Sequence, residues 1–177
     1  HPQKDDKILT DWNGMMISAL ARAARVLDND DYGNTAIKAM DFILLNLSSE
    51  EGRLLKRYRN GNAGLDGVLD DYAYTIWGLI ELYQYNFNPM YLEKAILFSD
   101  YQTKHFLDKE KGGFYFNSDI SEELLIRSKE IYDGAIPSGN SVSTNNFIKL
   151  GKLLYNADYE DLADNLLESF GAKINRY

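Results

Sequence analysis

Aspartates in three similar stretches are the residues of this sequence best suited to chemistry. The stretches are Asp6-Lys7-Ile8-Leu9-Thr10-Asp11, Asp66-Gly67-Val68-Leu69-Asp70-Asp71 and Asp133-Gly134-Ala135-Ile136-Pro137-Ser138. Each begins with an aspartate, continues through two apolar residues and ends in a side chain that could cap a helix. Two carboxyl groups at one site can serve as the acid and the base or nucleophile of glycoside hydrolysis. The three stretches are therefore the candidate source of catalytic carboxylates.

The aspartates of these stretches are expected to divide into structural and chemical roles. Asp11 and Asp71 stand where helices should begin, and aspartate is a favourable N-cap. A capping carboxylate accepts backbone N–H bonds that stabilise its charged form, so it would be a poor general acid. Asp70 has no capping duty if Asp71 caps the helix. The catalytic candidates are accordingly Asp70, Asp5 and Asp6.

Aromatic and amide side chains near the same stretches could bind a sugar, since rings can stack on its C–H faces and polar groups can meet its hydroxyls. The substrate-binding candidates are Trp12, Asn13, Tyr72, Tyr74, Asp133 and Asn140. Each also has a structural alternative. Trp12 and Tyr72 could pack in the core, and Asp133 precedes a glycine, which is typical of a turn. The two asparagines could hydrogen-bond within the fold.

Composition narrows the classes of function. The sequence has no cysteine and two histidines, which excludes thiol chemistry and a histidine metal cluster, so no metal or other cofactor is expected. A net charge of −8 argues against nucleic-acid binding. No apolar run approaches the ~20 residues of a membrane span, and no signal-peptide pattern is present. We therefore expect a cytoplasmic protein that does not bind membranes.

Six helices are expected to position these residues. Apolar residues at helical spacing predict three helix pairs, over about 11–47, 70–107 and 139–174. The first helix is expected to pack through one stripe, formed by Trp12, Met15, Met16, Ala19, Leu20, Ala23 and Leu27. The third helix, which ends near Tyr85, has almost no polar face and should be buried on all sides.

Long connections join the helix pairs. Residues 53–58, bounded by Gly52 and Gly61, predict a short β-ribbon over the helix ends, and residues 112–116 predict a second one. The apolar run Leu124-Leu125-Ile126 lies in the last connection, with no defined type. Because each connection links a second helix to the next first helix, the first helices should all begin on one side of the array.

An internal repeat supports this organisation. Tyrosine followed four residues later by alanine opens the second helix of each pair, at Tyr32/Ala36, Tyr91/Ala95 and Tyr159/Ala163. The aspartate stretches recur with nearly the same unequal spacing. Repeated units bury their apolar faces by stacking on their neighbours. The sequence therefore predicts a single all-α domain spanning 1–177, in which three αα-hairpins form about half of an (α/α)6 toroid with short β-ribbon loops.

Three segments resemble the spermatogenesis-associated, thioredoxin-domain-containing protein family. They are residues 4–21, 69–73 and 132–141, in the order found in that family, and the resemblance spans nearly the whole chain. Family members carry an N-terminal thioredoxin-like domain and then a helical region similar to six-hairpin glycosidases and N-acylglucosamine 2-epimerases. The resemblance implies that this chain is a fragment of the helical region, lacking the thioredoxin-like domain and the remaining hairpins, with a sugar or sugar-derived ligand.

Two functions of different class remain open. The first is a carbohydrate-processing domain with carboxylates and aromatics at its mouth, active in glycoside hydrolysis or sugar modification. An epimerase would usually use a histidine base, and the described stretches contain none. The second is a non-catalytic scaffold or binding module serving the thioredoxin-like domain. The fragment alone is expected to be inactive, and to self-associate through the exposed apolar edges of half a ring.

Overall fold

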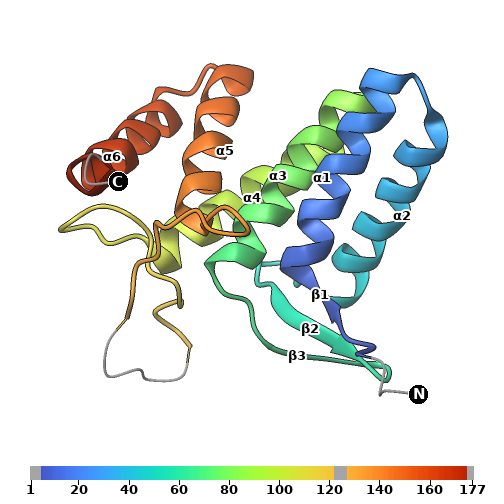
Figure 1. Ribbon diagram of the computed structural model, residues 1–177, viewed down its shortest axis with the longest axis horizontal. Coiled ribbons are helices and arrows are strands. Elements are labelled where there is room, and N and C mark those ends of the chain that lie inside the picture. The colour runs from blue at the N-terminus through green and yellow to red at the C-terminus, as the bar shows by residue number, and fades with distance from the viewer. Residues whose placement is uncertain (1–4, 122–126, 175–177) are drawn as a thin grey trace.

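The computed structural model describes residues 5–121 and 127–174, so Leu124-Leu125-Ile126 lies outside the described residues. Six helices occur in the described part and form three αα-hairpins (Figure 1), which confirms the expected arrangement. The helices are α1 (Thr10–Leu27), α2 (Asp30–Asn46), α3 (Leu69–Asn86), α4 (Pro89–Phe106), α5 (Gly139–Leu154) and α6 (Ala157–Ile174).

The first helices of the three hairpins form one layer. α3 packs against α1 on one side and α5 on the other, and α2, α4 and α6 each pack on the first helix of their own hairpin. Figure 1 accordingly shows the α3–α4 hairpin between the other two. α1, α3 and α5 are therefore the inner layer, and α3 is its centre.

The same turn closes all three hairpins. The first helix ends in a left-handed residue, Asp28, Phe87 or Tyr155, with φ of 51°, 56° and 52°. An asparagine follows each time, and its side chain accepts the N–H two residues further on, which caps the next helix; these asparagines are Asn29, Asn88 and Asn156. A left-handed residue reverses the chain within two residues, so the paired helices lie antiparallel.

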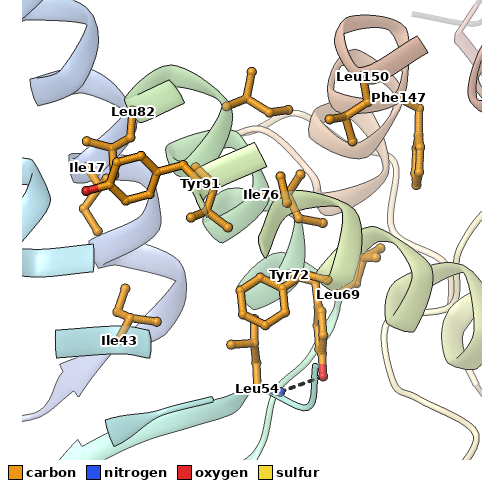
Figure 2. Close-up of a cluster of buried hydrophobic side chains, with 14 of the residues drawn as sticks. Ile17, Ile43, Leu54, Leu69, Tyr72, Ile76, Leu82, Tyr91, Phe147 and Leu150 are labelled. Atoms are coloured by element: carbon orange, nitrogen blue, oxygen red, sulfur yellow. Dashed lines mark hydrogen bonds between the residues drawn. The ribbon is translucent and has the colours of Figure 1, made fainter. Parts of the chain in front are cut away.

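α3 is nearly enclosed, as its composition predicts. Its side chains meet those of α1, α4 and α5 in one apolar cluster, part of which is drawn in Figure 2. Tyr72 stacks on Tyr101 and packs against Phe106, and its hydroxyl oxygen accepts the N–H of Leu54 at 2.8 Å. This hydrogen bond attaches the connection after α2 to the core.

α1 packs differently from the prediction. Its buried positions in the helix body are mostly small residues, Gly14, Ser18, Ala21 and Ala24, with one larger side chain at Ile17. The expected stripe is largely exposed or half-buried instead, with Trp12 61% and Met16 59% exposed. A Cβ at Gly14 would lie 2.7 Å from the backbone carbon of Tyr74, so only small residues permit this approach of α1 to α3.

A three-stranded antiparallel sheet lies near the beginnings of α1 and α3 (Figure 1). Its strands are β1 (Ile8–Leu9), β2 (Leu55–Arg59) and β3 (Asn62–Asp66), in the order β1-β2-β3. The first predicted ribbon is therefore present. The second is reduced to a single bridge between Leu107 and Phe114. Gly112 and Gly113 both have positive φ, which interrupts an extended strand at that point.

Candidate functional site

Asp71 connects the first turns of two inner helices. Its carboxylate is fully buried and accepts the N–H of Val68 at 2.8 Å and the N–H of Asp11 at 3.0 Å. The Lys56 ammonium, carried by β2, lies 3.5 Å from Asp71 and 3.0 Å from the carboxylate of Asp11. The sheet thus supplies a cation to two carboxylates that belong to different helices.

This arrangement corrects the predicted capping roles of Asp11 and Asp71. The N-cap positions of α1 and α3 are Leu9 and Val68, whose side chains have no hydrogen-bond acceptor. The first N–H groups of a helix still need partners. Here the Asp71 carboxylate supplies them from inside the first turn of α3, for its own helix and for α1. At α5 the cap is Ser138, which accepts the N–H of Ser141.

Asp70 lies at the interface of α3 with α5, on the other side of α3 from the contact that Asp71 makes with α1. Its carboxylate lies against Gly139 at the beginning of α5, and the backbone N–H of Gly139 favours the charged form of that carboxylate. Burial, and next the charge of Asp11, raise the pKa of Asp70, while the Gly139 N–H and Lys56 partly offset this. Among the ion pairs of the described residues Asp70 takes part in none. It is a half-buried carboxyl group that holds its proton more strongly than usual.

Trp77 shares a face of α3 with Asp70. Between Leu69 and Leu82 these are the two residues that are not buried. They are seven positions apart, two helical turns, and therefore lie on the same side of the helix. Trp77 is not among the site residues predicted from the sequence, although its spacing from Asp70 is visible there.

Tyr74 lies between them on α3 and is fully buried. Its hydroxyl donates to the carbonyl oxygen of Pro137, in the loop before α5. Burial, and then the charges of Asp70, Asp11 and Asp133, raise the pKa of the Tyr74 hydroxyl. The loop is therefore held against α3, and three carboxylates act on the same hydroxyl.

A pocket of about 270 Å³ lies between α3, α5 and this loop. It is lined by Trp77, Asp133, Pro137, Ser141, Val142, Asn145 and Asn146. Trp77 and Val142 also belong to a small apolar cluster with Met15, Ala73 and Tyr74. All five of these come from α1, α3 and α5, so the pocket lies on the inner-layer face away from the outer helices.

The structure brings one predicted binding residue into this pocket and gives two others structural roles. Asp133 lines the pocket, and one of its carboxylate oxygens accepts the N–H of Ser138 at 2.8 Å. Tyr72 is 1% exposed in the core, which corrects its expected contact with substrate. Asn140, also predicted to bind substrate, is 1% exposed, and its amide is occupied by the backbone of Phe114 and Glu130.

The remaining candidates lie outside the pocket wall. Asn13 donates its side-chain amide to the carbonyl of Leu9 at 2.7 Å, and Trp12 is exposed at the edge of α1. The catalytic candidates Asp5 and Asp6 are exposed and form ion pairs of 3.3 Å with Lys7 and 2.6 Å with Arg59. Those pairs hold both aspartates beside the sheet, where water reaches them. Of the three catalytic candidates, Asp70 is the one at the α3–α5 contact.

The described residues contain no group of three or more histidine, aspartate or glutamate side chains placed to hold a metal ion. Within the same part of the chain, every helix is too short or too polar to cross a membrane.

The fold is that of the α/α toroid enzymes. The structure of a GH76 α-mannanase from Bacteroides thetaiotaomicron matches with a TM-score of 0.79 at 19% identity, over 97% of this chain and 46% of that one. Cellobiose 2-epimerase from Bacillus thermoamylovorans matches with a TM-score of 0.79 at 17% identity, over 96% and 45%. The three hairpins therefore correspond to about half of an (α/α)6 toroid, as expected.

The sequence itself is similar to spermatogenesis-associated protein 20. The Homo sapiens protein is 32% identical over 185 residues, which cover 99% of this chain and 24% of the relative. The Rattus norvegicus protein is 32% identical over 97% of this chain and 23% of the relative. The resemblance to the spermatogenesis-associated family is thus confirmed along the chain, which spans about a quarter of the length of these relatives. No protein-family profile matches the sequence.

Proposed function

We propose that this chain is part of a carbohydrate-processing toroid and that it binds a saccharide in the α3–α5 pocket. The observation that carries the proposal is the lining of the pocket, where the Trp77 ring stands with Asp133, Ser141 and Asn145. An apolar ring surrounded by a few polar groups matches the two faces of a sugar. The fold supports the same class of ligand, since its structural neighbours include an α-mannanase and a cellobiose 2-epimerase.

Asp70, which lies at the α3–α5 contact and is not part of the pocket lining, is the proposed acid of this site. A general acid must hold a proton near neutral pH, and burial raises the pKa of Asp70 in that direction. Glycoside hydrolysis needs a second carboxyl group, and Asp133 is the one in the wall of the pocket. Asp70 would protonate the leaving oxygen while Asp133 acts as base or nucleophile. Glycoside hydrolysis or a related sugar modification is therefore the proposed reaction class.

Single-tryptophan variants test where a sugar binds, because the chain has two tryptophans, Trp12 and Trp77. Mannobiose and cellobiose would be titrated against Trp12→Phe, which leaves Trp77 as the fluorophore, and against Trp77→Phe. We expect a saturable emission change in Trp12→Phe and none in Trp77→Phe. A change reported by Trp12 alone would move the ligand to the edge of α1 and contradict the pocket assignment.

A non-catalytic scaffold or binding module is the second candidate. It is favoured by the hydrogen bonds of Asp71 to the first turns of α1 and α3, and by the close contact of the Asp70 carboxylate with Gly139 in α5. These contacts give both carboxylates a structural purpose without any reaction. Because this chain alone is expected to be inactive, the test uses a chain extended to the length of its relatives. Saccharide binding without release of reducing sugar, with either Asp or Asn at position 70, would support the scaffold over the enzyme.

A further inference from the structure

The charge in the wall of the α3–α5 pocket is of one sign, negative. Among the described residues that line it, Asp133 is the one with a charge, and none is a lysine or arginine. The Tyr74 hydroxyl, bound to the wall residue Pro137, lies in the combined field of Asp70, Asp11 and Asp133. A ligand in this pocket therefore meets the negative charge of Asp133 in the wall, beside a hydroxyl on which Asp70 and Asp11 also act.

Two cations carried by the inner helices α1 and α5 are paired with one buried glutamate. Lys149 lies on α5, three positions after the wall residue Asn146, and its ammonium is 2.7 Å from the carboxylate of Glu81. Arg25 of α1 reaches the same Glu81 at 2.8 Å. The Glu81 side chain is 3% exposed, so it depends on both partners for compensation of its charge.

Lys56 of β2, at the beginnings of α1 and α3, also lies between two carboxylates. Its ammonium is 3.0 Å from Asp11 and 3.5 Å from Asp71. Moving it toward a ligand would leave the fully buried Asp71 without its cation, at a large cost in free energy. Lys149, Arg25 and Lys56 are therefore all engaged by carboxylates, and none of these three charges is free to compensate an anionic ligand at this pocket.

We infer that the pocket selects saccharides by charge, accepting uncharged and amine-bearing sugars and rejecting uronates and sugar phosphates. This inference rests on the proposed function, because it specifies the ligand class of the same site. Asp133 is the specificity-determining residue, since its carboxylate is in the pocket wall and retains an oxygen beyond the one that accepts the Ser138 N–H. Repulsion of a ligand carboxylate by nearby aspartates would be strongest at low salt.

Two matched sugar series test the inference. The first is glucose, glucosamine and glucuronate, and the second is mannose, mannosamine and mannuronate, titrated against Trp12→Phe at pH 7 and low salt. In a series that binds, we expect the uronate to bind at least about tenfold more weakly than the neutral sugar, and the amine at least as tightly. Raising the salt should narrow the difference.

The substitution Asp133→Asn, made in the Trp12→Phe chain, tests whether the Asp133 carboxylate causes the discrimination against uronates. An asparagine oxygen can still accept the Ser138 N–H, so the loop should keep its conformation. We expect the ratio of neutral-sugar to uronate affinity to fall several-fold in this variant. Glu93→Gln on α4 removes the same charge from an exposed outer position and should leave the ratio unchanged. Uronate affinity equal to or above that of the neutral sugar would overturn this inference alone, whereas failure of all six sugars would overturn the proposed function with it.

Discussion

The backbone N–H of Asp11 donates to the carboxylate of Asp71, 3.0 Å away and 60 residues later in the chain. The two aspartates close corresponding stretches of consecutive repeats, so equivalent positions of neighbouring hairpins meet directly. Asp70 extends this relationship to the third hairpin through Gly139. Adjacent residues of α3 thus bind the first turns of the helices on either side.

Asp71→Ala should destabilise the fold by about 2–4 kcal/mol, because it leaves the buried N–H groups of Val68 and Asp11 without their acceptor and removes one of the two carboxylates paired with Lys56. Urea unfolding followed by circular dichroism measures this. Asp161→Ala, on the exposed face of α6, is the matched control and should change stability by less than about 0.5 kcal/mol. Similar effects of the two substitutions would remove the connecting role of Asp71.

Stability should fall as the pH rises through the range in which Asp71 loses its proton. Burial raises the pKa of Asp71 to about 7, against about 4 for an aspartate in an unfolded chain. The native state therefore binds this proton more tightly. Its stabilising contribution is complete below about pH 4 and is lost as the pH rises to about 7.

Lys56→Met should enlarge that loss, because the Lys56 charge lowers the pKa of Asp71 and its removal raises the pKa further. We expect the variant to be destabilised more at pH 8 than at pH 5, by on the order of 1 kcal/mol, in urea titrations at both values. Lys109→Met, at an exposed position, should show no such difference. An equal effect of Lys56→Met at both pH values would contradict the coupling.

Gly14→Ala should destabilise the contact of α1 with α3 by roughly 1–3 kcal/mol. The added Cβ would approach the backbone of Tyr74 and Thr75 to within 2.7–2.9 Å, and backbone cannot move aside as a side chain can. Gly171→Ala in α6 is the control, since nothing lies within 4 Å of its Cβ and alanine is the better helix former. Thermal unfolding should therefore shift down for Gly14→Ala and slightly up for Gly171→Ala.

Self-association remains a prediction of the exposed edge of α1. Trp12 and Met16 are 61% and 59% exposed on the same side of the helix, four residues apart. We expect light scattering to detect oligomers whose fraction rises with concentration, and the double substitution Trp12→Gln/Met16→Gln to reduce them. Leu45→Gln on α2, where a single leucine is 82% exposed, should have little effect. A monomer at millimolar concentration would refute the prediction.

The hairpins could be predicted from the sequence because both of their signals are local or periodic. Helical spacing of apolar residues locates the helices, and the recurring aspartate and tyrosine markers show that the unit is repeated. A third marker was available and was missed, the asparagine that caps each second helix at Asn29, Asn88 and Asn156.

The face of α1 and the details of the site could not be predicted in this way. Hydrophobicity indicated that Trp12 and Met16 are buried, whereas the closest helix contact is made by glycine, serine and alanine, whose small size matters more than their transfer free energy. Asp71 bonds to a neighbouring helix, and no periodicity within one helix encodes such a partner. Trp77 becomes a site residue because the loop at Pro137 and the beginning of α5 leave a pocket beside it.

The two carboxylates at the beginning of α3 also constrain how far α1 and α5 can shift along the axis of α3. A hydrogen bond tolerates a change of only a few tenths of an ångström in length. Asp71 imposes that tolerance on α1, and the Asp70 carboxylate packs against Gly139 of α5 at the same end of the layer. Sliding α3 along its axis by one residue, about 1.5 Å, would break both contacts together. The positions of α1 and α5 along the axis of α3 thus both depend on two consecutive residues, Asp70 and Asp71.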